Sequence, residues 1–433
     1  MESIWLKTAP PKPNFQKLKG DIKTEVLIIG GGITGILCAY MLKKASVPCI
    51  VVEADKICSG ITKNTTAKIT LQHGLIYDNL INKFGKEKAQ MYLDAQIKAA
   101  KMYKELSKKI PCDYAVEPST VYSLNNCRKI EKEISALNKL GICSRFVSTV
   151  PLPFKIAGGV QIKEQAQFHP LKFLYEISKD LEIYENTKVI EIKNNKAITE
   201  KGTISCKKII VATHFPFINK FGGYFLKMYQ HRSYVIALEK AQDVKGMYID
   251  EDEKGLSFRN YNEMLLLGGG SHRTGKSGGN WEELKQFSQQ YYPDKRILSQ
   301  WATQDCMSLD QVAYIGQYSK KTPDLFVATG FNKWGMTNSM VSAMILTDLV
   351  QGKHNDYAPV FAPDRSILKP QLFVNGFESI KGLITPTAPR CPHLGCALKY
   401  NKQEHSWDCS CHGSRFSEQG ELIDNPATND KKL

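Results

Sequence analysis

The sequence predicts an α/β protein with an inserted antiparallel sheet and a short metal-binding segment near its C-terminal end. A short apolar run at residues 25–29 leads directly into a glycine-rich turn and a helical stretch, which is the order of a parallel βαβ unit. Residues 225–270 alternate between apolar and polar side chains, as antiparallel strands do. Four cysteines and three histidines then lie within residues 391–412, which predicts a metal centre in the C-terminal segment.

The charge and the apolar runs exclude several classes of protein. The formal net charge is +15, but the lysines and arginines are scattered and no nucleic-acid-binding motif accompanies them. We interpret the charge as a basic surface that would favour an acidic redox partner by electrostatic steering. No run of about 18 apolar residues predicts a transmembrane helix, and the first residues lack the pattern of a signal peptide. We therefore expect a cytoplasmic protein that binds no nucleic acid.

The first βαβ unit carries a dinucleotide-binding pattern. Gly30, Gly32 and Gly35 fit G-x-G-x-x-G between the strand and a helix that runs to about Lys44. Gly30 allows the tight turn, and Gly32 lets the backbone approach a pyrophosphate at the helix N-terminus. Glu53 ends the second strand, where its carboxylate can accept hydrogen bonds from a ribose. This pattern alone leaves NAD and FAD open.

Later segments complete the α/β domain and favour a flavin. A long charged helix is predicted within residues 85–110, and strands are predicted at 187–193, 207–213 and 325–329. The last of these strands leads through a loop into a helix over 336–350. The N-terminus of such a helix would aim its partial positive charge at an electron-rich flavin ring.

These motifs resemble those of FAD-dependent oxidoreductases of the D-amino-acid-oxidase-like, or glycine-oxidase-like, family. The resemblance covers residues 25 to about 352 and implies an FAD-binding Rossmann-like domain with an inserted substrate domain. The matching segments are Gly30–Gly35 with Glu53, and residues 60–62, 65–68, 209–213, 301–305, 314–316 and 329–337. Beyond the glycine turn, the resemblance implies that the cofactor contacts Thr66, Val189, Gly330, Gly335, Met336 and Thr337.

The substrate side of this domain is poorly specified by sequence. Flavin enzymes need little acid–base machinery, because the cofactor carries the hydride chemistry. His231, His272 and Trp334 lie in segments that could face a flavin, and Arg259 could bind a carboxylate through two hydrogen bonds. Arg259 is the candidate catalytic residue, and no other residue is assigned that role.

The C-terminal cysteines and histidines form two loops, Cys391-Pro392-His393 and Cys409-Ser410-Cys411-His412. Two thiolates and two imidazoles could bind zinc, but the spacing C-x-H and C-x-x-H differs from that of zinc fingers. Both loops, with their flanks, resemble those of Rieske proteins. The resemblance implies a [2Fe–2S] cluster in which Cys391 and Cys409 hold one iron and His393 and His412 hold the other.

The Rieske resemblance implies three further features. Cys396 and Cys411 would form a disulfide between the two loops, and Ser414 would donate a hydrogen bond to a cluster sulfur. Phe416 stands where a tyrosine often donates a second bond, so an intermediate potential is expected within the Rieske span of about −150 to +300 mV. The resemblance also implies that this segment is a small all-β domain. It is short for such a domain, so we expect it to be trimmed and to be covered in part by the flavin domain.

The resemblance as a whole is to FAD-dependent oxidoreductases with a fused C-terminal Rieske domain. It divides the chain into an oxidoreductase domain, a linker and a Rieske domain, over residues 1–354, 355–370 and 371–433. FAD-binding parts are expected over about 25–80, 187–220 and 305–352, and a substrate subdomain over about 81–186 and 221–304.

Such a chain would oxidise or reduce a small amine or amino-acid-like substrate at FAD. The cluster would exchange electrons one at a time with a redox partner protein, and both directions of electron flow fit the sequence. The alternative is an electron-transfer protein that holds both cofactors but acts on no organic substrate of its own. A closed substrate pocket would favour this alternative.

Overall fold

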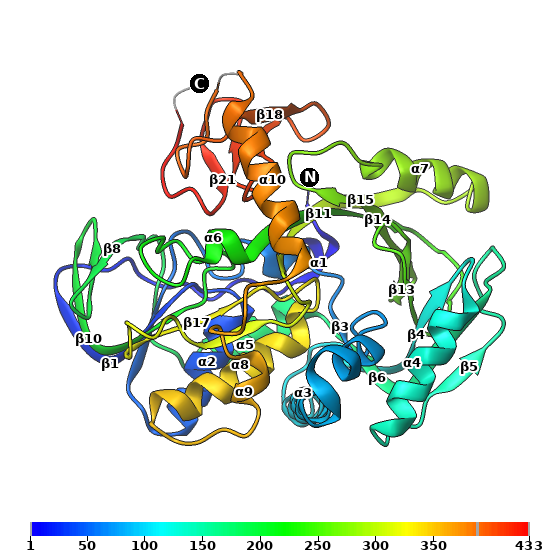
Figure 1. The fold of residues 1–433 in the computed structure, drawn as a ribbon, viewed down its shortest axis with the longest axis horizontal. Helices are drawn as coiled ribbons and strands as arrows, with labels where there is room; N and C mark the ends of the chain where they lie inside the picture. The colour runs from blue at the N-terminus through cyan, green and yellow to red at the C-terminus, as the bar shows by residue number, and fades with distance from the viewer. Residues whose placement is uncertain (1, 387–388, 432–433) are drawn as a thin grey trace.

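The computed structural model describes residues 2–386 and 389–431, and Figure 1 shows how they are arranged. Two large sheets lie side by side, and a small sheet sits on top of them with the helix that leads into it. The mixed α/β class and the small all-β region near the C-terminal end are confirmed.

The first sheet has 8 strands, and its central strands are parallel. Its path runs β16-β17-β10-β1-β2-β7; β9 also pairs with β10, and β8 pairs with β9. The strands are β1 (Ile22–Ile29), β2 (Cys49–Val52), β7 (Ile183–Tyr184), β8 (Val189–Lys193), β9 (Lys196–Thr199), β10 (Gly202–Val211), β16 (Tyr314–Gln317) and β17 (Leu325–Thr329).

Both faces of this sheet are covered, which explains its continuous apolar strands. Val26 and Ile28 pack toward α2 (Ile33–Lys44) and α8 (Gly335–Val350). Leu27 and Ile29 point to the opposite face and pack in a second core with residues of β8 to β10. Because strand side chains alternate, one run of apolar residues fills two cores.

The second sheet has 9 strands and forms the inserted domain. Its path runs β15-β11-β14-β13-β12-β4-β6-β3, with β5 alongside β6. The strands are β3 (Lys68–Ile69), β4 (Ala115–Ser123), β5 (Arg145–Val147), β6 (Gly158–Gln167), β11 (Met228–Leu238), β12 (Met247–Asp250), β13 (Ser257–Tyr261), β14 (Met264–Arg273) and β15 (Ile297–Ser308). The pairing is antiparallel except between β4 and β12, which are parallel. The expected antiparallel sheet is therefore mixed, because two separate insertions meet at that pair.

The remaining helices pack around these sheets. They are α1 (Ile4–Thr8), the 3₁₀ helix η1 (Ile61–Asn64), α3 (Tyr77–Ser107), α4 (Cys127–Lys139), α5 (Pro170–Ser178), α6 (Tyr224–Lys227), α7 (Asn280–Tyr291), α9 (Ala358–Phe361) and α10 (Pro370–Ile384). The helix predicted within 85–110 corresponds to α3, which is broken at Gly85, where φ is +83°. Among the described residues, no helix is long and apolar enough to cross a bilayer.

The C-terminal segment differs from the expectation in two places. Its third sheet is the antiparallel meander β18 (Leu398–Asn401), β19 (Ser406–Cys409), β20 (Arg415–Ser417) and β21 (Leu422–Asp424). This sheet is preceded by α10, so the region expected to be all-β begins with a helix. Residues 355–370, expected to be a linker, are partly packed: Phe361 is fully buried, and Arg365 pairs with Asp310 at 3.0 Å. These contacts come from distant strands and helices, which composition alone does not reveal.

Candidate functional site

A large cavity of about 1070 Å³ lies where the three sheets meet. Its wall includes the loops after β1, β2, β10 and β17, at the carboxyl ends of the parallel strands, where ligands of doubly wound sheets bind. Strands β11, β14 and β15 supply a second wall, and residues 422–428 of the C-terminal segment supply a third. The volume is at the upper end of the range for small-molecule sites, about 300–1,000 Å³.

The glycine turn has the shape that the sequence predicts. Gly30 has a φ of +113°, and a Cβ there would lie 2.5 Å from the Ala212 carbonyl oxygen. At Gly35 a Cβ would lie 1.9 Å from the Gly30 oxygen, so glycine permits close contact of helix and strand. At Gly32 the nearest neighbour of a Cβ would be Thr62 Oγ1 at 3.3 Å, and the residue lines open space in the cavity. The turn therefore fits a pyrophosphate at the N-terminus of α2.

Glu53 lies at the rim of the same cavity, beside the glycine turn. Its Oε2 accepts a hydrogen bond from the Gly31 N–H at 2.7 Å, and its Oε1 accepts one from the Asp55 N–H at 3.0 Å. Burial raises the pKa of this carboxyl. Each carboxylate oxygen can accept a further bond, so the side chain can still bind a ribose. Thr66 and Val189 also line the cavity.

The loop after β17 and the start of α8 place only some of the residues expected to contact the cofactor at the cavity. Gly330, Gly335 and Met336 line the cavity, but Thr337 is not among the cavity-lining residues. Its hydroxyl lies 3.0 Å from His73 Nε2, and the His73 ring stacks on Trp334 with 5.0 Å between ring centroids. Thr337 therefore fixes the loop from behind.

Arg259 does not face the cavity. Its guanidinium is buried, and Nη1 donates hydrogen bonds to the carbonyl oxygens of Thr66 at 2.7 Å and Ala67 at 2.9 Å. The guanidinium also lies 5.4 Å from the centroid of the buried Trp5 ring. The candidate carboxylate-binding residue thus positions the cavity-lining segment at Thr66. Of the three other residues considered, Trp334 lines the cavity, whereas His231 and His272 are not among its lining residues.

This placement predicts a stability effect rather than a change in substrate affinity. Replacing Arg259 with methionine leaves the Thr66 and Ala67 carbonyl groups buried without their donor. We expect the free energy of unfolding to fall by about 2–4 kcal/mol in urea denaturation. Arg128, which is on the surface helix α4, provides a control through Arg128→Met. A raised KM with unchanged stability would instead assign Arg259 to substrate binding.

Charged residues that the sequence reasoning missed line two walls of the cavity. Asp305 lies on β15 and Lys333 lies in the loop after β17, and both are half-buried. Burial lowers the pKa of Lys333, and Asp305 opposes that effect; burial raises the pKa of Asp305 to about 6. Lys68 also lines the cavity, and its burial, with Arg259 nearby, lowers its pKa to about 7. The available signal was position, because Lys68, Asp305 and Lys333 all lie in segments that match the family, at 65–68, 301–305 and 329–337.

The four candidate cluster ligands converge at the top of the second sheet. The thiols of Cys391 and Cys409 are buried and interact, and the hydrogen bond from Cys409 lowers the pKa of Cys391 to about 7. Among the described residues, Nδ1 of His393 and Nδ1 of His412 are buried without a hydrogen-bond partner. Two paired thiols and two imidazole nitrogens without partners fit the two cysteine and two histidine ligands of a Rieske centre.

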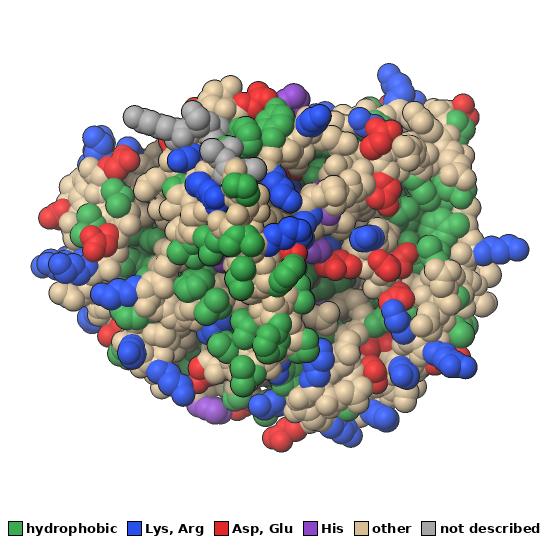
Figure 2. All heavy atoms as spheres, turned by 45° about the horizontal axis from the view of Figure 1, so that its top comes forward, with side chains coloured by type: hydrophobic (Ala, Val, Ile, Leu, Met, Phe, Trp, Pro, Cys, Tyr) green, Lys and Arg blue, Asp and Glu red, His purple; other side chains and the backbone are tan. Residues whose placement is uncertain are grey.

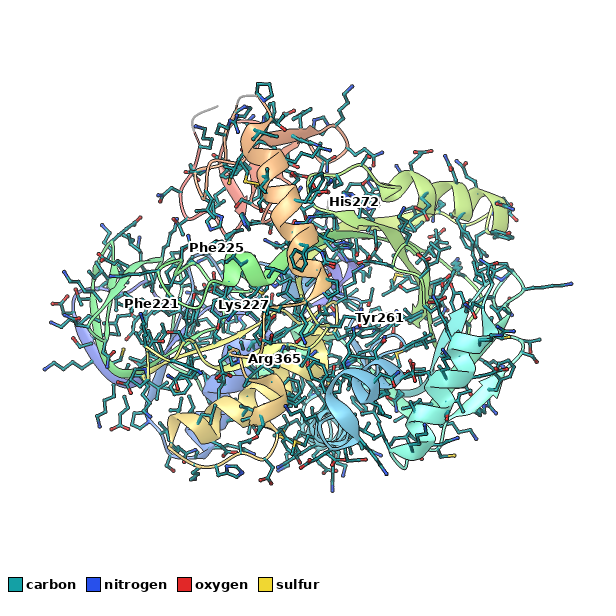
Figure 3. All side chains as sticks on the ribbon, viewed as in Figure 1. Phe221, Phe225, Lys227, Tyr261, His272 and Arg365 are labelled. Atoms are coloured by element: carbon teal, nitrogen blue, oxygen red, sulfur yellow. A yellow bond between two sulfur atoms is a disulfide. The ribbon has the colours of Figure 1, made fainter. Side chains whose placement is uncertain are left out.

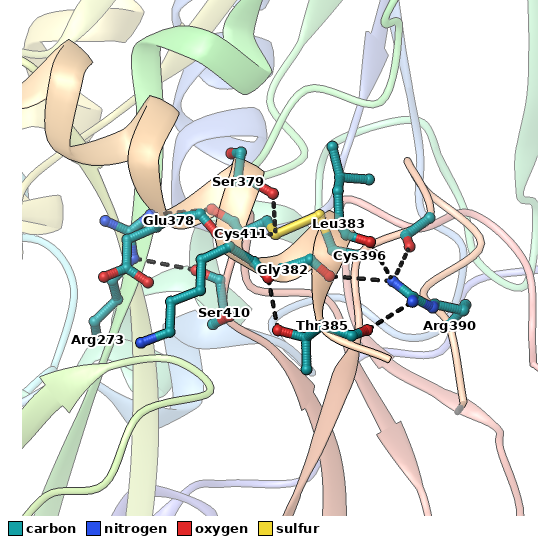
Figure 4. Close-up of a disulfide and its surroundings, with 12 residues drawn as sticks. Arg273, Glu378, Ser379, Gly382, Leu383, Thr385, Arg390, Cys396, Ser410 and Cys411 are labelled. Atoms are coloured by element: carbon teal, nitrogen blue, oxygen red, sulfur yellow. Dashed lines mark hydrogen bonds between the residues drawn. A yellow bond between two sulfur atoms is a disulfide. The ribbon is translucent and has the colours of Figure 1, made fainter. Parts of the chain in front are cut away.

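A disulfide joins Cys396 to Cys411 across the two ligand loops, as the resemblance implied (Figure 4). The Sγ atoms of this pair and of Cys409 lie within 4.8 Å of one another. Because disulfide sulfurs carry no thiolate, only Cys409 of these three can bind iron. Ser414 contacts Cys391 and helps to lower its pKa, and its Oγ accepts a hydrogen bond from the Ala427 N–H at 2.9 Å.

Side chains of the second sheet hold the backbone of the second ligand loop. Gln230 Nε2 donates to the His412 carbonyl oxygen at 2.9 Å, and Gln304 Nε2 donates to the Gly413 carbonyl oxygen at 2.8 Å. A Cβ at Gly413 would lie 2.6 Å from the Gln230 Cβ, so the loop lies directly on β11. The His412 ring also meets Phe225 of α6 edge to face, with 6.1 Å between centroids; Figure 3 shows Phe225 below the C-terminal segment. The C-terminal segment therefore packs against the oxidoreductase domain, as expected, through these specific contacts.

A buried ion network joins the third sheet to the second. Glu404 pairs with Arg232 of β11 and with Arg415 of β20, and its Oε1 accepts a bond from the Tyr234 hydroxyl at 2.7 Å. Burial by itself raises the pKa of Glu404, but the two guanidinium groups outweigh it and lower the pKa to about 2. The charged form of Glu404 therefore contributes to docking of the segment.

This network predicts loss of stability in acid. The stabilisation from Glu404 is complete above the pKa of an unfolded glutamate, about 4.3, and disappears as the pH falls toward 2. We expect its contribution to the free energy of unfolding, on the order of 3 kcal/mol, to vanish between about pH 5 and pH 2. Over that pH range, the midpoint temperature of thermal unfolding should fall more steeply in the parent than in Glu404→Gln. If the midpoint temperatures of the two proteins fall in parallel as the pH is lowered, Glu404 does not cause the loss of stability in acid.

Family models match both parts of the chain. The model described as FAD dependent oxidoreductase matches residues 25–349, and the model described as Rieske [2Fe-2S] domain matches residues 364–432. A Bacillus subtilis protein named as a Rieske 2Fe-2S iron-sulfur protein, YhfW, is 34% identical, over 98% of this chain and 96% of its own length. The iron-sulfur subunit of the Arabidopsis thaliana cytochrome b6-f complex is 46% identical, over 8% of this chain and 16% of its own length.

Solved structures with a similar fold cover about four-fifths of the chain. Glycine oxidase from Geobacillus kaustophilus has a TM-score of 0.67 at 18% identity, and the match covers 79% of this chain and 99% of that one. L-proline dehydrogenase from P. horikoshii has a TM-score of 0.68 at 18% identity, covering 80% of this chain and 98% of that one. At this level of identity the likeness is one of fold.

Proposed function

The chain belongs to the family of FAD-dependent oxidoreductases and carries a C-terminal Rieske domain, and from this premise we propose a coupled redox function. The protein would oxidise or reduce a small amine or amino-acid-like substrate at FAD and exchange single electrons through the [2Fe–2S] cluster. Its partner in the cytoplasm would be a one-electron redox protein with an acidic surface, which the net charge of +15 would attract. The domain limits expected from sequence belong to this proposal, with residues 355–370 as a packed connection.

The proposed ligands follow from the geometry. FAD would bind at Gly30, Gly32 and Gly35 with Glu53, and it would contact Thr66, Val189, Gly330, Gly335 and Met336, while Thr337 supports the loop from behind. Cys391 and Cys409 would hold one iron, and His393 and His412 the other. When bound, FAD exchanges an electron pair with the substrate, and the cluster exchanges one electron at a time.

One observation carries the coupling of the two centres. Residues 422–428 of the C-terminal segment line the same cavity as the glycine turn. Asn425 fixes this wall, because its Nδ2 donates to the carbonyl oxygens of Thr213 at 2.7 Å and Phe215 at 2.9 Å. The cluster segment is therefore part of the wall of the flavin site, which favours direct transfer over two independent centres.

The substrate side has groups that can bind and exchange a proton. Asp305, with a pKa near 6, can hold or release a proton close to neutral pH, and Lys333 beside it can attract a carboxylate. The cavity wall also includes Ser233, Ser271 and Thr303, whose hydroxyls can orient polar groups. An open, charged and partly polar cavity supports an organic substrate.

The test is anaerobic bleaching of the flavin. The purified protein, loaded with FAD and iron, is mixed with single amines and amino acids, and flavin absorbance is followed with that of an added one-electron acceptor. At least one compound should bleach the flavin and then reduce the acceptor. If none does, while a reduced protein or nicotinamide donor bleaches the flavin, the chain is the electron-transfer protein without a substrate of its own.

A further inference from the structure

Helix α10 exposes a continuous apolar face. We call this the apolar face of α10, and we include Leu368, which lies just before the helix. Its side chains are between 49% and 76% exposed, and its members are Leu368, Phe373, Val374, Phe377, Ile380, Leu383 and Ile384. Figure 2 shows this group of hydrophobic side chains at the centre of one side of the molecule. Phe373, Phe377, Ile380 and Ile384 follow the three- and four-residue spacing of one helix side. A patch of this kind marks an interaction site rather than an ordinary surface.

The opposite side of α10 is fixed to the body of the protein. Asn375 Oδ1 accepts a bond from Arg273 Nη1 at 3.0 Å, and Glu378 pairs with Lys276 at 2.6 Å. A Cβ at Gly382 would lie 2.5 Å from Cys411 Sγ, so the helix lies tightly on the disulfide (Figure 4). The helix therefore already has its partners within the chain, and its apolar face points outward as a rigid surface.

The charges around this face are positive. Between residues 366 and 390 the only acidic residue is Glu378, which Lys276 neutralises. Among the described residues, Lys369, Lys381 and Arg390 form no ion pair within 4 Å of a carboxylate: Lys369 lies over the Phe84 ring, Arg390 bonds to backbone carbonyls, and Lys381 interacts with Glu378 only at longer range. The chain as a whole carries +15. An apolar helix face with basic residues around it complements a surface that has an apolar interior and an anionic outer layer.

A lipid surface fits this description better than a protein surface does. A second copy would bring the same positive border against itself, which is unfavourable. A protein partner would need a separate pocket for each protruding side chain, whereas the boundary of headgroups and acyl chains accepts Phe, Leu and Ile without pockets. Helices that lie in that boundary combine such an apolar side with lysines and arginines.

We propose that the apolar face of α10 docks the protein on an anionic lipid surface, with the helix lying in the plane of that surface. The cluster segment would then lie close to the lipid, because Arg390 Nη1 donates to the Leu383 carbonyl oxygen at 3.0 Å and so joins α10 to the first ligand loop. Leu394 of that loop, next to the candidate ligand His393, is 42% exposed. The lipid surface is an addition to the function proposed above and does not depend on the identity of the substrate.

The experiment measures binding of the FAD- and iron-loaded protein to vesicles by flotation. Vesicles of phosphatidylcholine with phosphatidylglycerol supply the anionic surface, and pure phosphatidylcholine vesicles supply the neutral one. Phe377→Ser with Ile380→Ser removes two apolar side chains without adding charge. Ile190→Ser on β8 is the matched control, because Ile190 is 56% exposed and lies away from α10 (Figure 1).

The parent and Ile190→Ser should bind the anionic vesicles. The double variant should bind them at least ~10-fold more weakly, because it lacks two apolar side chains whose transfer from water to lipid would favour binding. Binding to neutral vesicles, or at high salt, should be weaker than to anionic vesicles. Three results would overturn the proposal: no binding by the parent, equal binding by the double variant, or a dimer that depends on Phe377. The last would assign the face to a second copy.

Discussion

Replacing His412 with alanine is expected to stop onward electron transfer while leaving the flavin reducible. The change removes a proposed ligand of the second iron, so the cluster should be lost or damaged. Any donor that bleaches the flavin of the parent should still bleach that of the variant. Delivery to a one-electron acceptor such as a cytochrome should fall at least ~10-fold, equivalent to about 1.4 kcal/mol of barrier. Stopped-flow absorbance of flavin and acceptor separates the two steps.

His405 provides the control for this experiment. It lies in the same C-terminal segment, but its exposed side chain pairs with Glu418 on the surface, away from the ligand loops. His405→Ala should keep the iron, the inorganic sulfide and the acceptor turnover of the parent. Unchanged acceptor turnover in a His412→Ala protein shown to lack the cluster would mean that the two cofactors work separately, and the coupled function would have to be abandoned.

Gly32→Val is expected to abolish FAD binding without unfolding the protein. A Cβ at Gly32 would meet one atom, Thr62 Oγ1 at 3.3 Å, so a side chain there requires only a small shift of the Thr62 side chain. The added methyl groups would instead occupy the space where the backbone approaches a pyrophosphate. Affinity for FAD should fall at least ~100-fold, or about 2.8 kcal/mol, measured by fluorescence titration of the apoprotein.

Gly376→Val supplies the matched control. Gly376 lies on α10, a Cβ there would meet nothing within 4 Å, and the residue does not line the cavity. This variant should retain yellow colour and the parental affinity for FAD. A Gly32→Val protein that folds and keeps full FAD would contradict the assignment of the glycine turn.

The parts that sequence predicted well depend on short-range patterns. The βαβ unit is encoded by the run at 25–29, the glycines and Glu53, because a tight turn and a buried parallel strand each require particular residue types. The two ligand loops are likewise encoded by the spacing of Cys391, His393, Cys409 and His412. In each case the deciding residues are near one another in sequence, and the structure brings them to one place.

The parts that sequence missed depend on distant contacts. Arg259 looked like a substrate-binding residue, but its partners, Thr66 and Ala67, lie almost 200 positions earlier in the chain. Helix α10 was missed because its apolar residues point outward, whereas a helical pattern is usually interpreted by the side that it buries. Lys333 and Asp305 meet in the cavity from a loop and a strand that only the folded sheet brings together.

The amide side chains beneath the cluster loop have a consequence for how the protein responds to iron supply. Thr274 Oγ1 donates to Gln304 Oε1 at 2.9 Å, and Gln304 Nε2 donates to Gln230 Oε1 at 2.8 Å, so one chain of bonds runs from β15 and β11 to the His412 carbonyl. A cluster that binds only the folded protein stabilises the folded state by mass action. This stabilisation extends to every strand and loop that must be folded for the ligands to hold the cluster. Iron starvation would therefore weaken the inserted sheet as well as the cluster segment, and with it a wall of the cavity. A cell short of iron would make a protein whose flavin site is less stable, so that the two cofactors fail together.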